Sequence, residues 1–193
     1  MRIIMSMEKS DILKIFKATK ALMDGHFVLR SGLRSRQYFQ CALALQDMPT
    51  VEKLVKSLLN KRKSDEIETV VAPAMGGLVL GQEVARQLGK RFIFFEKVDG
   101  NLAMRRGFQL RAGEKVLIVE DVVTRGGRVQ ETLDIVRQHG AEPVEVLVLV
   151  DRSSGNVDLG VTMTSLLEME VETFSPDALP EDLAGIPPVK PGS

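Results

Sequence analysis

Cysteine and tryptophan are almost missing from this sequence of 193 residues, which has one cysteine, Cys41, and no tryptophan. A single cysteine excludes a disulfide framework within the chain and a zinc site built from several cysteines. No apolar run approaches the roughly 18 residues that a membrane helix needs, and the amino-terminal apolar run is too short for a signal peptide. These absences predict a soluble cytoplasmic protein.

An excess of charge of either sign is also absent. Lys and Arg together number 26, as do Asp and Glu, so the formal net charge is zero. Such a surface offers a polyanion no net attraction, which argues against a dedicated nucleic-acid-binding protein. Hydrophobic residues make up 44% of the chain, enough to bury a core, and the length predicts a single domain over residues 1–193.

Apolar patterns predict strands that alternate with helices along most of the chain. The expected buried strands lie near 67–72, 91–95, 115–120 and 144–150, and the expected helices near 10–23, 48–63, 76–88 and 127–139. This alternation predicts an α/β fold with a central parallel sheet flanked by helices. Three shorter elements are expected as well: a long loop or hairpin at 97–107, an edge strand at 163–171 and a short helix at 180–184.

The most informative stretch is 115–132, which reads KVLIVEDVVTRGGRVQET. Glu120 and Asp121 follow its aliphatic run, at the carboxyl end of a strand, where open α/β sheets bind ligands. Residues 122–128 then form a turn that opens a helix, and the converging N–H groups of such a turn suit a phosphate. Acids beside an anion site suit hydroxyls, or a divalent cation bound together with phosphates. A phosphorylated ribose meets both requirements.

A second turn between a strand and a helix, at 73–77, can receive another anion on its N–H groups. Two familiar phosphate motifs are missing. No G-x-G-x-x-G follows a strand, and Gln82 stands where a P-loop requires lysine. A dinucleotide-binding fold and a P-loop nucleotidase are therefore not expected.

The run E-D-V-V-T-R-G-G at 120–127 resembles the phosphoribosyl-diphosphate (PRPP) signature of the type I phosphoribosyltransferases. Within that family the chain is most similar to the short bacterial orotate phosphoribosyltransferases, over roughly 25–192. The resemblance implies a Rossmann-like core at about 48–151, with a small hood formed by an amino-terminal flap, about 1–47, and a tail, about 160–193. It implies transfer of phosphoribosyl from PRPP to orotate, giving orotidine 5-phosphate and diphosphate in pyrimidine synthesis.

The resemblance assigns PRPP to three groups of residues. Glu120 and Asp121 would bind the ribose hydroxyls, and Asp121 is also assigned as catalytic. The 5-phosphate and the diphosphate would be held by two turns. The first turn comprises Val122, Val123, Thr124, Arg125, Gly126, Gly127 and Arg128, and the second contributes Met75 and Gly76. Arg125 and Arg128 stand where the family commonly has Thr or Ala, and Ser; they either strengthen phosphate binding or point outward into solvent.

Residues 97–106 correspond to the family's mobile catalytic loop, which closes over the neighbouring site in a homodimer. Its cations would neutralise the leaving diphosphate. Lys97 and Arg105 are assigned as catalytic, Lys97 also as PRPP-binding, and Arg106 is a further charge. A lysine that the family loop carries close to Asn101 is missing, which leaves open a non-catalytic, PRPP-sensing regulator.

The resemblance assigns orotate to five residues. Arg152 would face the anionic base, since its planar fork can make two parallel bonds, and Thr124 would stand beside it. Arg30 would contact PRPP or orotate, and Tyr38 and Phe39 would line the base, although aromatic residues at this spacing equally fit a core. Transfer to another base is the alternative, and Arg152 disfavours a neutral purine.

The expected cofactor is Mg²⁺, carried by the diphosphate and the ribose hydroxyls and not by a protein cage. The expected partners are PRPP, orotate and a second copy of the chain, with no nucleic acid and no membrane.

Overall fold

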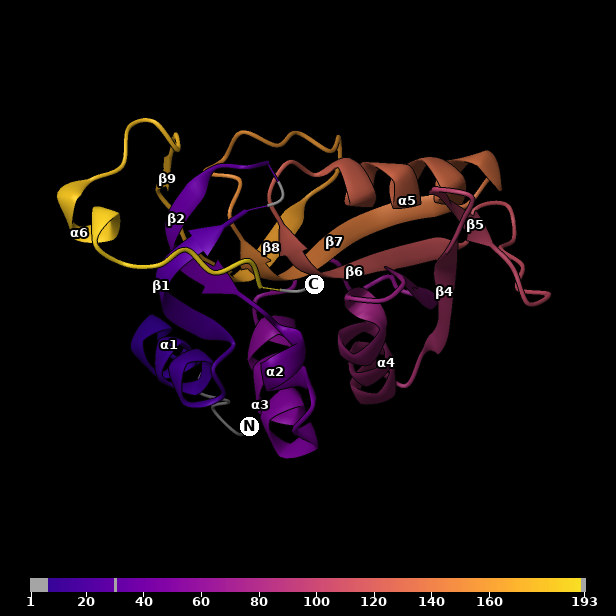
Figure 1. The fold of residues 1–193 in the computed structure, drawn as a ribbon. Helices are drawn as coiled ribbons and strands as arrows, with labels where there is room; N and C mark the ends of the chain where they lie inside the picture. The colour runs from indigo at the N-terminus through magenta and orange to yellow at the C-terminus, as the bar shows by residue number, and fades with distance from the viewer. Residues whose placement is uncertain (1–6, 30, 192–193) are drawn as a thin grey trace.

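The computed structural model describes residues 7–29 and 31–191 and contains a large sheet and a small one (Figure 1). The large sheet comprises β3 (Thr69–Pro73), β4 (Arg91–Val98), β5 (Asn101–Met104), β6 (Lys115–Val123), β7 (Glu142–Asp151) and β8 (Met163–Glu168). Its strand order is β5-β4-β3-β6-β7-β8, and every neighbouring pair is parallel except β4 and β5. The predicted α/β fold with a central parallel sheet is therefore confirmed, with one antiparallel strand at its edge.

Helices cover both faces of the large sheet. Three of them, α1 (Lys9–Ala18), α3 (Met48–Leu59) and α4 (Gly77–Leu88), lie on one face, and α5 (Gly127–Gln138) lies on the other (Figure 1). Consecutive residues of β6 divide between these faces, so Leu117 packs toward α3 and α4 while Ile118 packs toward α5. A strand buried on both faces needs the continuous aliphatic run seen at 116–119. Within the described residues, no helix is long and apolar enough to cross a membrane.

The first helix is shorter than its pattern predicts. It ends at Ala18 and not near 23, because Lys20 adopts φ 58° and turns the chain. Leu22, the last apolar residue of the helical pattern, instead begins a strand and pairs with Phe39. The apolar residues at 21–22 serve the small sheet, so the periodicity misplaced this boundary.

The polar stretch at 97–107 forms the predicted hairpin at its start. β4 and β5 meet in a tight turn at Asp99 and Gly100, whose φ values are 48° and 94°. Two consecutive positive φ values are typical of the two-residue turns that match the twist of a hairpin.

The small sheet forms the predicted hood. It comprises β1 (Leu22–Val28), β2 (Arg34–Phe39) and β9 (Thr173–Phe174), with α2 (Ala42–Leu45) and α6 (Glu181–Ala184) in the adjoining segments. The tail returns to β1, where the N–H of Val28 donates to Val189 O at 2.8 Å and the N–H of Val189 donates to His26 O at 2.8 Å. Flap and tail are thus joined by backbone hydrogen bonds.

The hood is smaller than its predicted limits of 1–47 and 160–193. β8 belongs to the large sheet, where it pairs with β7 and is buried at four consecutive positions. Helix α1 packs against the small sheet, and its buried Ile12 and Phe16 belong to the core shared with the large sheet, with Phe16 edge-on to Phe39 of β2. Pairing with β7 thus removes 163–168 from the hood.

Candidate active site

A cavity of about 880 Å³ lies between the carboxyl end of β6, the start of α5 and the hood. Eleven of the predicted site residues line it: Tyr38, Phe39, Asp121, Val122, Val123, Thr124, Arg125, Gly126, Gly127, Arg128 and Arg152. Segments predicted separately from the sequence therefore meet at one cavity. The strand order explains this, because the carboxyl ends of β3, β6 and β7 lie at the same edge of the sheet.

The acid pair at the end of β6 lies directly against the start of α4. A Cβ atom at Gly76 would stand 2.6 Å from Asp121 Oδ1, and one at Gly77 would stand 3.4 Å from Glu120 Oε1. Any side chain at Gly76 would occupy the place of the Asp121 carboxylate. The two predicted anion-binding turns therefore flank a single pair of acids.

Burial changes the charge of this acid pair. Glu120 is 6% exposed, and burial, together with the negative charge of Asp121, raises the pKa of its carboxyl group. Burial also raises the pKa of Asp121, although the N–H of Val122 donates to Asp121 Oδ1 at 2.8 Å. Two full negative charges are costly here, so the pair favours retaining a proton. A carboxylic acid beside a carboxylate can both donate to and accept from hydroxyl groups.

The turn after the acids forms an anion cradle. Gly126 precedes α5 with φ 73°, and a Cβ atom there would lie 2.6 Å from Val157 Cγ1, so only glycine fits. The first N–H groups of a helix have no partner within it. Because Gly127 and Arg128 line the cavity, these unpaired donors of α5 lie at its wall.

Arg125 and Arg128 both line the cavity and do not point away from it. Arg125 is exposed. Arg128 Nη1 lies 3.0 Å from Glu131 Oε2, and Glu131 Oε1 also accepts from the N–H of Leu102 in the hairpin. The sequence left the direction of both arginines open, and their position favours a contribution to anion binding.

Arg152 combines burial with an unsatisfied donor. Its Nε is buried and has no hydrogen-bond partner among the described residues, and its guanidinium carbon lies 5.8 Å from the centroid of the Phe39 ring. Burial lowers the pKa of the guanidinium group. A buried cationic donor without a partner is unfavourable alone and suits an anion entering the cavity.

The two predicted aromatic residues differ in role. Phe39 is 6% exposed and packs edge-on against Phe16, with ring centroids 6.1 Å apart, so it supports the core as well as lining the cavity. Tyr38 is half-buried and lies 5.7 Å from the Phe27 ring centroid. Arg30, the remaining prediction from the flap, lies outside the described residues.

Several predicted residues do not line this cavity. Lys97 and Arg105 are exposed on the hairpin and the residues after it, and Arg106 binds Glu96 at 2.6 Å. Met75 is 82% exposed beside the acid pair. Glu120 lies behind Asp121, buried against Gly77. The cavity is therefore lined by Asp121, the cradle and Arg152, but not by the loop cations Lys97, Arg105 and Arg106.

The sequence did not reveal all the residues that form the walls. The hood contributes further lining residues: Leu29, Ser31, Leu33, Val171 and Thr173. Leu29 and Leu33 lie in the flap close in sequence to Tyr38, so this nearness was a usable signal. Val171 and Thr173 reach the cavity through pairing of β9 with β2, which no local pattern predicts.

Comparison with known proteins decides the family. A family model described as a phosphoribosyl transferase domain matches residues 42–178. The orotate phosphoribosyltransferase of Desulforamulus reducens is 48% identical over 187 residues, which cover 97% of this chain and 98% of that protein. The chain belongs to the orotate phosphoribosyltransferase family. The family member from Caldicellulosiruptor bescii is 47% identical with the same coverage.

Solved structures agree with this family. The orotate phosphoribosyltransferase of Aeropyrum pernix has a TM-score of 0.72 and 28% identity, covering 82% of this chain and 93% of its own. The adenine phosphoribosyltransferase of Thermoanaerobacter pseudethanolicus has a TM-score of 0.66 at 16% identity, covering 80% and 99%, and shares the fold alone. The resemblance read from 120–127 is thereby confirmed for nearly the whole chain.

Proposed function

We propose that this protein transfers the 5-phosphoribosyl group from PRPP to orotate, giving orotidine 5-phosphate and diphosphate in pyrimidine biosynthesis. The observation that carries this proposal is the meeting of Asp121, the α5 cradle and Arg152 at one cavity, with Glu120 buried next to Asp121. The family of the chain supports it, since relatives with 97% coverage of this chain are orotate phosphoribosyltransferases.

PRPP fits the order of these groups. The α5 cradle suits the 5-phosphate, and the acid pair suits the ribose hydroxyls. The start of α4 suits the diphosphate, because Gly76 brings its backbone against Asp121. One end of the cavity then remains for the acceptor base, between Tyr38 and Arg152.

Arg152 supports an anionic acceptor. A carboxylate on the base would satisfy the buried, unpartnered guanidinium donor, and hydrogen bonds to charged groups each contribute about 1.5–3 kcal/mol. A neutral base would leave that donor unpaired. We therefore assign to Arg152 the preference for orotate over uracil, adenine or hypoxanthine. Thr124 would lie beside the reacting sugar.

Catalysis is proposed to depend on positioning and charge neutralisation. Holding the base against the anomeric carbon of the sugar can lower a barrier by about 7–11 kcal/mol. Thr124 has no hydrogen-bonded base among the described residues, and no covalent step is proposed. Lys97 and Arg105 are exposed away from their own cavity, and we assign them to the neighbouring cavity of a homodimer.

The cavity also fits Mg²⁺ carried by the substrate. Asp121 presents a carboxylate to the cavity, and the backbone of Gly76 lies against that carboxylate. When bound, Mg²⁺ would neutralise charge on the diphosphate. Glu120 and Asp121 would hold the hydroxyls and keep the sugar oriented. We also propose that the protein acts in the cytoplasm.

One assay tests the proposed function. Purified protein is given PRPP and Mg²⁺ with orotate, uracil, adenine or hypoxanthine in parallel, and diphosphate release is measured. We expect turnover with orotate alone. Turnover of adenine but not orotate would contradict the assigned base, and tight PRPP binding without turnover of any base would favour the regulator suggested by the missing lysine near Asn101.

A further inference from the structure

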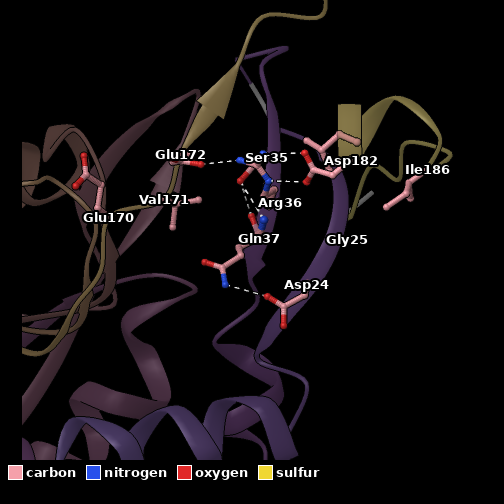
Figure 2. A pocket seen from close by; sticks show the side chains of 11 residues that line it. Asp24, Gly25, Ser35, Arg36, Gln37, Glu170, Val171, Glu172, Asp182 and Ile186 are labelled. Carbon is pink, nitrogen blue, oxygen red and sulfur yellow. Dashed lines mark hydrogen bonds and ion pairs between the residues drawn. The ribbon is translucent and has the colours of Figure 1, made fainter. Parts of the chain in front are cut away.

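Arg36 on β2 binds three side chains of the carboxyl-terminal segment, Glu172, Phe174 and Asp182. Figure 2 shows its bonds to Glu172 and Asp182. Its Nε and Nη2 donate to the two carboxylate oxygens of Asp182 at 2.7 and 2.8 Å. Its Nη1 donates to Glu172 Oε2 at 2.6 Å, and its guanidinium carbon lies 4.6 Å from the Phe174 ring centroid. A planar fork can serve two carboxylates and an aromatic face at once, which an ammonium group cannot. We call these four residues the Arg36 clamp.

Few backbone bonds hold this segment in place. β9 has two residues and pairs with β2 only at Arg34–Phe174 and Ser35–Thr173. The next backbone pairing with the hood is at Val189, which pairs with β1. So short an edge strand contributes little order by itself. Between these two connections, the side chains of Arg36 and His26 hold the segment, Arg36 through Asp182 and His26 through the Ile186 carbonyl oxygen at 2.7 Å.

The clamp lies directly behind a wall of the main cavity. Val171 and Thr173 line that cavity on the hood side, while Glu172 and Phe174 contact Arg36. Val171 also lines a second cavity of about 470 Å³, which contains Arg36 (Figure 2). The side chain of Val171 thus lies between the clamp and the main cavity.

We infer that the Arg36 clamp positions Val171 and Thr173 as a wall of the acceptor-base site and thereby sets the affinity for the base. This inference rests on the proposed function, because it assigns the hood end of the cavity to the base. The groups proposed for PRPP lie on α4, α5 and the end of β6, outside the hood. Loss of the clamp should therefore weaken binding of the base and leave binding of PRPP unchanged. Arg36 is a positioning residue and touches no substrate.

The test compares R36Q, R36K and D182N with the wild type and with a matched control, R62Q. Arg62 forms an ion pair with Asp65 at 2.6 Å, outside the hood. For R36Q we expect the KM for orotate to rise about tenfold and the KM for PRPP to stay within twofold. D182N should show a smaller rise, R36K should restore only part of the affinity, and R62Q should match the wild type.

Equal rises in both KM values, or no rise in either, would overturn the inference. The melting temperature checks the fold of each variant, and only small changes are expected because the pairs are largely exposed. If the wild type turns over a base other than orotate, the proposed function fails. The inference about the clamp is then tested by the KM for that base. Failure of the proposed function and failure of the inference therefore remain distinguishable.

Discussion

Asp121 occupies the space that a side chain at Gly76 would need, with its Oδ1 and Oδ2 at 2.6 and 2.9 Å from a Cβ atom built there. This contact joins the end of β6 to the start of α4. It places the acid proposed for the sugar hydroxyls beside the backbone donors proposed for the diphosphate, so the spacing of the two groups is set by the absence of a side chain at Gly76.

Gly76→Ala should weaken PRPP binding by at least about tenfold, equal to about 1.4 kcal/mol. The new methyl group displaces the Asp121 carboxylate, which can rotate away, so the free energy of unfolding should change little. Calorimetric titration with PRPP and urea unfolding measure the two quantities. Gly185→Ala is the matched control, since a Cβ atom there meets nothing within 4 Å. Unchanged PRPP affinity in Gly76→Ala would remove Asp121 from the binding site.

Glu120→Gln should stabilise the ligand-free protein at high pH. Burial and the charge of Asp121 raise the pKa of Glu120 above its ordinary 4.5, so folding retains a proton that the unfolded chain releases. Wild-type stability from this group is complete below pH 4.5 and falls as the pH rises toward the folded pKa. In urea unfolding, the advantage of Glu120→Gln should therefore grow from pH 5 to pH 8. A constant difference across this range would contradict the raised pKa.

Glu114→Gln should lower the free energy of unfolding at neutral pH, which is opposite to the effect expected for Glu120→Gln. Burial alone would raise the pKa of Glu114, but hydrogen bonds from Thr69, the N–H of Arg111 and the side chain of Arg91 outweigh it and lower the pKa to about 2. The stability that the lowered pKa of Glu114 contributes is present above pH 4.5 and is lost as the pH falls toward 2. At pH 7 the substitution should cost up to about 3 kcal/mol of unfolding free energy, since a pKa unit corresponds to about 1.4 kcal/mol. Near pH 2 it should cost almost nothing.

Arg152→Gln should raise the KM for orotate by roughly 10- to 100-fold, because one or two charge-assisted hydrogen bonds are lost. The dissociation constant for PRPP should stay within twofold of the wild type. Steady-state kinetics and PRPP titration distinguish the two effects. A variant with unchanged KM for orotate would show that the unpartnered Nε of Arg152 serves the fold and not the base.

Local sequence patterns predicted most of the large sheet. The aliphatic run at 116–119 predicted a strand buried on both faces, and the helix expected at 76–88 does end at Leu88, before Gly89 with φ 65°. The helix predicted at 10–23 was too long because Leu22 fits a helical period and a strand equally well. Only its pairing with Phe39 distinguishes the two.

The features of the site that the sequence could not show depend on pairing between segments that are distant in the chain. The acids and the glycine-rich turn were visible because each follows its own strand, and parallel strands bring their ends together. Thr173 has no such context, since a two-residue strand pairs it with Ser35 from the opposite end of the chain. The exposure of Lys97 and Arg105 away from their own cavity is likewise a property of the folded hairpin.

The pairing of β9 with β2 also bears on the order in which the site forms during synthesis. β2 leaves the ribosome early and must wait for β9, whereas β3, β6 and α5 lie between them in the chain and can assemble first. A nascent chain that has released residues up to Arg152 already carries the acid pair, the cradle and Arg152. It still lacks the wall formed by Val171 and Thr173, so the groups proposed to hold the sugar phosphate are in place before those proposed to enclose the base.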